Sequence, residues 1–391
     1  MKAAGINAST DVVVGAPHIL IVAGEVSGDL HAASVIKSLR KKHTDIKITG
    51  VAGQAMQAQG CHVLHPMTLL NVMGIGDVVK ALPRIRRIGS DIGKWVANEK
   101  PDLVILVDFP GFNMRLGEKL RKLGVPVLYY IAPKLWAWGG WRVKRLRRAQ
   151  DKLACILPFE PEWFAKRGID ASYVGNPSAL ACKDGWPRSE LKAKLGIQAS
   201  APLLALLPGS RRSELAIHAG LLADVYIKLR KTIPNLVAVT TRAPSVTDAQ
   251  LQPLLAAGVH VLDRLDADYA MRADAAIAVS GTATLELALW DTPTVLVYKG
   301  ASLTVWLARK LVAMQCVGLA NILLDDKPVM PELIQEQATV EHIMQAILPL
   351  LQDQSVANEQ RRQFEVLRQR LGNLHPSDAV ADIAWEMLKH E

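Results

Sequence analysis

An aspartate that follows an aliphatic run is the first candidate for chemistry. Residues Leu103–Val107 are all aliphatic, and Asp108 stands directly after them, close to Pro110 and Gly111. A carboxylate at the carboxyl end of a buried strand lies where ligands usually bind, and there it can remove a proton from a substrate hydroxyl. The same placement also suits a carboxylate that caps a helix or pins a loop. Asp108 is therefore a candidate general base, and the structural role stays open beside it.

A turn rich in small and hydroxyl residues precedes a helical pattern in the second half of the chain. It consists of Ser280, Gly281, Thr282, Ala283 and Thr284. Unpaired N–H groups at a helix N-terminus, together with such hydroxyls, bind phosphate without a metal. Glu286 lies near the start of this helix and is placed to accept hydrogen bonds from ribose hydroxyls. A small-residue turn that only permits tight strand–helix packing is the alternative.

A second turn of this kind follows the aliphatic run Leu203–Leu207. It contains Gly209, Ser210 and Arg211. Glycine lets the backbone approach a ligand closely, and the planar guanidinium of an arginine can grip a diphosphate. A capping turn with a surface arginine explains the same residues without a ligand.

The first half of the chain has its own turn after the apolar run His18–Ala23. The residues of interest in it are Gly24, Glu25, Ser27, Gly28 and Asp29. Small residues there let backbone N–H groups approach an anion or a sugar, whereas Ser27 or Asp29 could equally cap the next helix. The spacing is not GxGxxG, so it does not support a dinucleotide site.

Two stretches combine apolar or aromatic residues with cations. One contains Trp136, Trp138, Trp141 and Arg142, followed by Lys144, Arg145, Arg147 and Arg148. The other, Met67–Val96, contains Met73 and Gly74 together with Arg84, Arg86 and Arg87. The first pattern can serve nucleic acid, lipid phosphate or sugar, and the second is typical of an interfacial membrane element. Core helices and a partly buried tryptophan cluster beside solvated basic faces are the alternatives.

Short apolar runs alternate with amphipathic helical patterns along most of the chain. The first set of predicted strands is 18–23, 46–51, 103–107, 127–131 and 153–157, and the second set is 203–207, 237–241, 259–262, 275–279 and 294–297. This rhythm predicts an α/β protein with parallel sheets covered by helices on both faces. A turn-rich segment around Trp186 predicts a first domain over 1–186 and a second over 187–357. Helices are expected from 358 to 391, the last of them starting at Pro376.

Composition limits the possible classes of protein. The chain has 391 residues, 50% of them apolar and 21% charged, and a formal net charge of +9. Large cores are therefore expected, and the positive charge favours an anionic partner. The four cysteines are far apart, no apolar stretch is long enough to span a membrane, and no signal peptide is apparent. No spacing suggests metal ligands, so no cofactor is expected.

Several short blocks occur in one order from about Ile19 to about Glu336. They read GEVSGD, VMGIGDV, VDFPGFN, APKLWAW, LPFEPEWF, LLPGSR, SGTATLE and VGLANIL. In order and spacing they resemble the lipid-A-disaccharide synthase family. The resemblance implies a GT-B fold, which has two Rossmann-like domains with a cleft between them and a C-terminal helix that crosses back to the first domain. The helices expected over 358–391 would make this return.

The resemblance also implies an activity and roles for residues. The expected reaction is the inverting transfer of 2,3-diacylglucosamine from UDP-2,3-diacylglucosamine to 2,3-diacylglucosamine 1-phosphate, with release of UDP. Asp108 would be the general base and Asn321 would position substrate. Arg211 and the turn at 280–284 would hold the donor diphosphate, with Glu286 on the ribose.

The first half would hold the acceptor at a membrane. Its implied residues are Gly24, Glu25, Ser27, Gly28, Asp29, Met73, Gly74, Trp136, Trp138 and Arg142. The resemblance implies a peripheral protein on the cytoplasmic face of the inner membrane, with no nucleic-acid partner and possible homo-oligomers.

The sequence departs from the family pattern at Ala132, Gly139, Asn176 and Ala320. These departures concern acceptor positioning and leave the nucleotide half intact. A different UDP-sugar enzyme of the same fold, such as a peptidoglycan lipid glycosyltransferase or a UDP-sugar epimerase, is the alternative. A nucleic-acid-binding protein is the non-enzymatic alternative, and it predicts steeply salt-dependent binding with little response to UDP.

Overall fold

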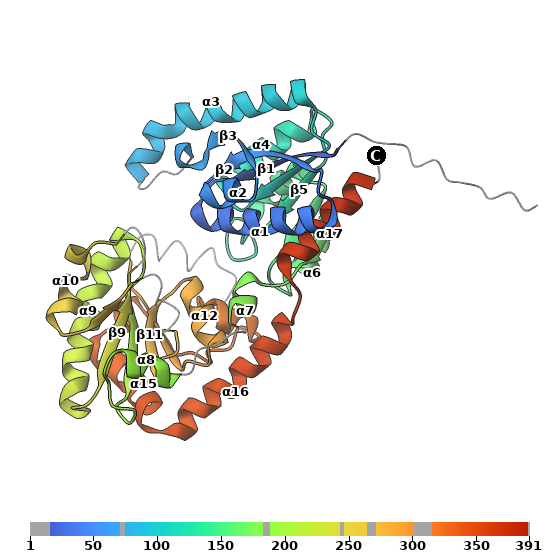
Figure 1. Cartoon of the computed structure of the whole chain (residues 1–391). Helices are drawn as coiled ribbons and strands as arrows, with labels where there is room; N and C mark the ends of the chain where they lie inside the picture. Colours follow the sequence, from blue (N-terminus) through green and yellow to red (C-terminus); the bar gives the residue numbers. More distant parts are fainter. Residues whose placement is uncertain are drawn as a thin grey trace, which may run out of the picture. The chain divides into compact units, whose positions relative to one another are not determined.

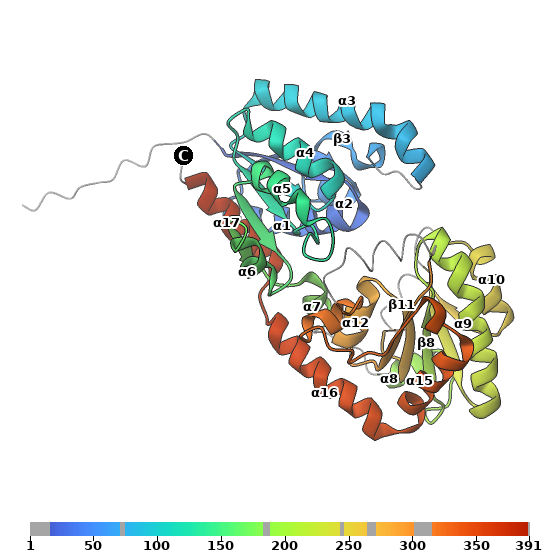
Figure 2. The ribbon, with the colours of Figure 1, turned by 180° about the vertical axis from the view of Figure 1, so that it is seen from behind.

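The computed structural model describes residues 16–70, 75–182, 188–242, 246–263, 271–300 and 315–389. These residues form two units (Figures 1 and 2). Unit 1 holds the described residues of Met1–Pro133, Trp141–Val174 and His375–Glu391, and unit 2 holds those of Lys134–Gly140 and Gly175–Leu374. The chain therefore visits unit 2 briefly, enters it again after Val174 and returns to unit 1 at His375.

Unit 1 is built on a sheet of seven parallel strands in the order β3-β2-β1-β4-β5-β6-β7. The strands are β1 (His18–Ala23), β2 (Lys47–Ala52), β3 (His62–Pro66), β4 (Leu103–Val107), β5 (Val127–Tyr130), β6 (Lys152–Cys155) and β7 (Ala171–Tyr173). Strands β1, β4 and β5 are buried along their whole length. Uninterrupted apolar runs are expected of strands that helices cover on both faces.

Helices of unit 1 cover both faces of this sheet (Figure 1). They are α1 (Val26–Lys42), α2 (Gln54–Ala58), α3 (Ile75–Glu99), α4 (Pro110–Arg121), α5 (Val143–Ala149), α6 (Glu160–Ala165) and α17 (Pro376–Lys389). The last helix packs on α1, where Ser38 Oγ donates to Asp378 Oδ1 at 2.6 Å and Trp385 stacks on His43. The C-terminal helix is thus part of the first core.

Unit 2 repeats the plan with six parallel strands in the order β10-β9-β8-β11-β12-β13. The strands are β8 (Leu203–Leu207), β9 (Val237–Thr241), β10 (His260–Leu262), β11 (Ala275–Val279), β12 (Thr294–Tyr298) and β13 (Glu332–Ile334). The described helices are α7 (Pro177–Ala181), α8 (Arg188–Lys194), α9 (Arg212–Thr232), α10 (Asp248–Ala256), α12 (Thr282–Leu289), α14 (Leu319–Leu323), α15 (Val340–Gln352) and α16 (Gln354–Leu371). Helices α9, α10 and α15 pack on one face of the sheet, and α8 and α12 pack on the other.

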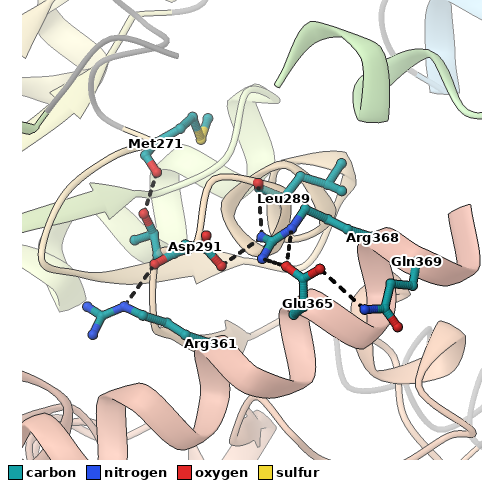
Figure 3. A network of polar contacts seen from close by, with 8 residues as sticks. Met271, Leu289, Asp291, Arg361, Glu365, Arg368 and Gln369 are labelled. Carbon is teal, nitrogen blue, oxygen red and sulfur yellow. Dashed lines mark hydrogen bonds and ion pairs between the residues drawn. The ribbon is translucent and has the colours of Figure 1, made fainter. Parts of the chain in front are cut away.

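Helix α16 is fixed to the turn between α12 and β12 by a network of charged groups (Figure 3). Asp291 of this turn has a left-handed φ of 57°. Its carboxylate accepts a hydrogen bond from Arg368 Nη1 at 2.7 Å, and its carbonyl oxygen accepts one from Arg361 Nε at 3.3 Å. Glu365 in turn accepts from Arg368 Nη2 at 2.5 Å. Helix α16 therefore belongs to unit 2, and of the two C-terminal helices α16 and α17 only α17 packs in unit 1.

The predicted α/β class with parallel sheets is confirmed, and strands β1, β4, β8, β9 and β11 have the predicted bounds. The short edge strands β3, β7 and β13 were not predicted. The contact-based division falls after Val174, whereas the sequence placed it near residue 186. It separates α7 from unit 1 because α7 packs on α12.

Candidate active site

The order of strands reverses at one place in each sheet. In unit 1, β2 lies on one side of β1 and β4 on the other, and in unit 2, β9 and β11 flank β8 in the same way. Ligands of open α/β sheets bind outside the carboxyl ends of the strands at such a reversal. Ala23 is aligned with Val107, and Leu207 with Ala278. The structure therefore brings together the predicted turns after β1 and β4 in unit 1, and those after β8 and β11 in unit 2.

The turn that carries Asp108 has an unusual backbone. Asp108 and Phe109 both have φ 47°, and neither is glycine. Left-handed conformations cost non-glycine residues about 1–3 kcal/mol each, and they persist where neighbouring groups hold them. Here Asn113 Nδ2 donates to the carbonyl oxygen of Asp108 at 2.8 Å and to that of Val107 at 3.1 Å. The backbone thus fixes the direction in which the half-buried Asp108 leaves the sheet.

Tyr129 provides a second support for the same carbonyl. Its hydroxyl donates to the carbonyl oxygen of Asp108 at 2.7 Å. Burial, and next the negative charge of Asp108, raise the pKa of Tyr129 well above its usual range, while Arg142 acts in the opposite direction. Tyr129 therefore remains a protonated donor at neutral pH.

The turn after β1 contains residues whose structural roles the sequence alone did not decide. Gly24 is buried, and a Cβ there would overlap the ring of Phe109. Asp29 is 4% exposed and accepts hydrogen bonds from the backbone of Gly53 at 2.7 Å and Ala55 at 2.9 Å. It therefore caps α2 and not its own helix. Among the other candidates in this turn, Gly28 is buried close to Ala23 and Val107, and Glu25 and Ser27 are exposed.

The turn after β8 is organised by Glu214. Gly209 has φ 98°, and a Cβ there would come within 2.5 Å of Glu214 Oε2. That carboxylate accepts from the N–H of Ser210 at 3.1 Å and from that of Arg211 at 3.2 Å. Arg211 Nη1 also donates to Glu214 at 2.8 Å, although the Arg211 side chain is 81% exposed. The guanidinium is thus pre-oriented by one partner and open to solvent on its other side.

The turn after β11 leads into α12, as predicted. Gly281 and Thr282 are exposed and Ala283 is half-buried, and the first N–H groups of a helix have no partner within it. Thr284 differs from the expectation of a phosphate-facing hydroxyl, because it is buried and its Oγ1 donates to the carbonyl of Gly281 at 2.8 Å. Glu286 is half-buried in the second turn of α12.

A neighbouring segment is held by two carboxylates. Gln315 and Cys316 donate their N–H groups to Asp326 at 2.6 and 2.8 Å. Val317 and Gly318 donate theirs to Glu332 at 2.8 and 2.9 Å. Four consecutive N–H groups are therefore paired with carboxylates, which support the conformation of the segment.

Asn321 lies beneath this segment. It is fully buried, its Nδ2 donates to Met330 O and to Glu332 Oε1 at 2.8 Å, and its Oδ1 accepts from Met330 N at 2.9 Å. These bonds use its amide within the protein core. Its position suits a residue that acts through Glu332 and the 315–318 segment, not one that touches substrate.

A pocket of about 210 Å³ lies beside α12 within unit 2. Ser280 and Gly281 line it together with Val317, and Lys134 and Trp136 contribute from the short stretch that joins this unit. Ser280 Oγ donates to the carbonyl of Val317 at 3.4 Å. The structure thus brings Trp136, expected on the acceptor side, next to the turn expected to bind the donor.

The remaining predicted residues fall into three groups. Trp138 is 54% exposed, and Gly139 beside it has φ 82°, a conformation that favours the glycine found there. Burial lowers the pKa of Arg142, Tyr129 opposes this effect, and Arg145 lowers the pKa further, so Arg142 belongs to the surroundings of the Asp108 turn. Met73 and Gly74 lie outside the described residues.

Sequence reasoning missed the supporting residues. They are Asn113, Tyr129, Glu214, His218 and Glu332. His218 is fully buried, its Nε2 accepts from the N–H of Lys299 at 2.9 Å, and its Nδ1 lies 2.8 Å from the carbonyl oxygen of Glu214. Only Glu214 had a local signal, an acidic residue at the third position of a helix. The others depend on contacts between distant strands and helices.

Among the described residues, no three His, Cys, Asp or Glu side chains are grouped so that they could hold a metal ion. Within the same part of the chain, every helix is too short or too polar to cross a membrane.

The fold and the paired turns define a class of protein. A UDP-N-acetylglucosamine 2-epimerase from Neisseria meningitidis, solved with UDP-GlcNAc, is similar with a TM-score of 0.62 and 14% identity over 96% of this chain and 100% of that one. The calicheamicin glycosyltransferase is similar with a TM-score of 0.57 and 17% identity over 96% and 99% of the two chains. At such identities the likeness concerns the fold alone, and the fold is GT-B.

Sequence comparison narrows the class to one family. The model of the family described as lipid-A-disaccharide synthetase matches residues 19–381. The lipid-A-disaccharide synthase of Myxococcus xanthus is 35% identical over 95% of this chain and 98% of its own length, and that of Trichlorobacter lovleyi is 36% identical over 97% and 100%. The chain belongs to the lipid-A-disaccharide synthetase family and is a glycosyltransferase, as the resemblance predicted.

Proposed function

We propose that this glycosyltransferase performs an inverting displacement in which Asp108 is the general base. The 6-hydroxyl of 2,3-diacylglucosamine 1-phosphate gives its proton to Asp108 as its oxygen bonds to the anomeric carbon of UDP-2,3-diacylglucosamine. The bond between that carbon and the diphosphate breaks, and UDP leaves. The observation that carries the assignment is the strained turn of Asp108, held at the strand reversal of unit 1 by Asn113 and Tyr129.

Unit 2 is assigned the donor. The leaving diphosphate gains negative charge, and the N–H groups at the start of α12 together with Arg211 supply fixed positive potential for it. The exposed surface of Gly281 and Thr282 and the orientation of Arg211 by Glu214 support this role. Glu286 is assigned to the ribose, and Asn321 is a positioning residue.

Unit 1 is assigned the acceptor and the membrane surface. Trp141 is 69% exposed, and Arg84, Arg86 and Arg87 are exposed on α3. Exposed tryptophan and cationic side chains suit contact with anionic headgroups. Peripheral attachment to the cytoplasmic face of the inner membrane follows as part of the proposal. Co-sedimentation with anionic vesicles at low salt, reduced at high salt, is the expected behaviour.

A product assay tests the function directly. The purified protein, UDP-2,3-diacylglucosamine and 2,3-diacylglucosamine 1-phosphate are expected to yield a disaccharide 1-phosphate of inverted anomeric configuration and one UDP per bond formed. An undecaprenyl-linked acceptor and a donor-only reaction serve as controls. Transfer to the undecaprenyl acceptor, or a 2-epimer from the donor alone, would contradict the proposal.

A further inference from the structure

An apolar pocket lies between helices α3 and α4 of unit 1. Its volume is about 520 Å³, within the ~300–1,000 Å³ typical of small-molecule sites. Leu82 and Ile85 line it from α3, and Phe112 and Leu116 line it from α4. These residues come from successive turns of each helix, so the pocket extends along both helices. We call it the channel.

The position of the channel ties it to the Asp108 turn. Its lining on the α4 side starts at Phe109, the residue after Asp108, and continues to Lys119. At 1.5 Å per residue this stretch extends about 15 Å. A ligand in the channel therefore has one end beside the turn that carries the proposed general base.

The polar residues of the lining carry a net positive charge. Arg86, Arg115 and Lys119 are exposed cations, and Glu25 is the single carboxylate among the lining residues. Apolar walls with a cationic rim suit an amphiphile that has a phosphate next to a hydrocarbon chain.

Glycines of α3 determine how wide the channel is. A Cβ at Gly89 would lie 3.4 Å from Phe112 Cε2, and a Cβ at Gly93 would overlap the end of Lys119. Lys119 Nζ also donates to the carbonyl oxygen of Gly89 at 3.3 Å, so its side chain lies across α3 at the far end. A larger residue at position 89 would therefore narrow the channel part of the way along it.

We propose that this channel binds one acyl chain of the phosphorylated acceptor, and that the space left by Gly89 beside Phe112 determines how long a chain the channel accepts. The inference rests on the proposed function, because the acceptor is the substrate that Asp108 has to reach. A membrane phospholipid has similar chemistry, but the start of the channel beside Asp108 favours the substrate.

Binding of alkyl phosphates tests the channel without turnover. Octyl, dodecyl and hexadecyl phosphate, each below its micelle concentration, are titrated into the full-length protein. We expect Gly89→Leu to weaken the binding of hexadecyl phosphate about tenfold or more and that of octyl phosphate much less, since each buried methylene adds to affinity. Phe112→Ala should instead extend the preference to longer chains. Gly220→Leu is the matched control, because a side chain at this glycine of α9 meets nothing within 4 Å.

Three results would overturn the inference. One is equal weakening for all chain lengths in Gly89→Leu with unchanged thermal unfolding. Another is unchanged length preference in both Gly89→Leu and Phe112→Ala. The third is a loss of vesicle binding in Gly89→Leu while the acyl-length preference of turnover stays as in the wild type, which would assign the channel to a membrane lipid. Absence of transfer with intact length-dependent binding would instead contradict the proposed function alone.

Discussion

At the scale of single residues, the proposed base Asp108 and the proposed diphosphate contact Arg211 both depend on neighbouring residues that take no part in the reaction. Asp108 is held through its main chain by Tyr129 and Asn113, and Arg211 is oriented by Glu214. A base or a guanidinium that is fixed before substrate binds needs less reorganisation in the transition state. Such partners should affect kcat or affinity without contacting substrate.

Tyr129→Phe removes one of the two hydrogen bonds that support the Asp108 carbonyl. The loss of about 1–2 kcal/mol expected for such a bond should lower kcat about 5- to 30-fold. The KM for the donor should stay near the wild-type value, because Tyr129 is not placed in unit 2. Steady-state kinetics over a range of pH provide the measurement, and an effect on donor KM alone would remove the positioning role.

Arg211→Ala should weaken the binding of UDP without unfolding the protein. The ion pair with Glu214 is exposed and joins residues three apart, so its contribution to stability is at most about 1 kcal/mol. A diphosphate contact should make UDP affinity fall about tenfold or more. Calorimetric titration of UDP measures this, with Arg212→Ala, a neighbouring exposed arginine, as control. Equal affinities in the two variants would refute the diphosphate role.

At the scale of elements, the sequence predicted best those strands whose own residues show the pattern expected of a buried strand. Runs such as Leu103–Val107 and Ala275–Val279 are aliphatic throughout because both faces are covered, and their bounds were predicted as found. The edge strand β13 has only three half-buried residues and shows no such run. The roles of Asn113, Asp29 and Asn321 were not predictable, because their partners are backbone groups whose positions only the folded sheet defines.

His218 connects two elements of unit 2 and makes its stability depend on pH. Burial lowers the pKa of His218, although Glu214 opposes the effect, so the folded protein favours the neutral ring. Its contribution to stability is therefore present above the unfolded pKa of about 6.5 and is lost as the pH falls through and below that value. Burial also lowers the pKa of His18 and His31, which add to the same trend in unit 1.

His218→Gln should accordingly reduce the loss of stability between pH 7 and pH 5. The amide carries no proton to take up, while one of the two hydrogen bonds can still form. Thermal unfolding across this range of pH measures the effect. A variant that loses stability with pH as steeply as the wild type would exclude His218 as a source of the dependence.

At the scale of the whole molecule, the six strands of unit 2 follow the order of the first six strands of unit 1, and each sheet places two loops at its reversal. Family membership assigns the reaction, and the residues at the two reversals suggest how the work is divided. Unit 1 offers a carboxylate and an apolar channel, whereas unit 2 offers backbone N–H groups and an arginine. The central claim is that the base and the UDP site belong to different units.

The most direct test of this claim is UDP titration combined with single-turnover transfer in Asp108→Asn. The substitution keeps the shape of the side chain and removes its basicity, so transfer should fall by about 100-fold or more. UDP affinity should remain within about twofold of the wild type, because the nucleotide is assigned to unit 2. A variant that still transfers at the wild-type rate, or that loses UDP binding together with transfer, would contradict the account.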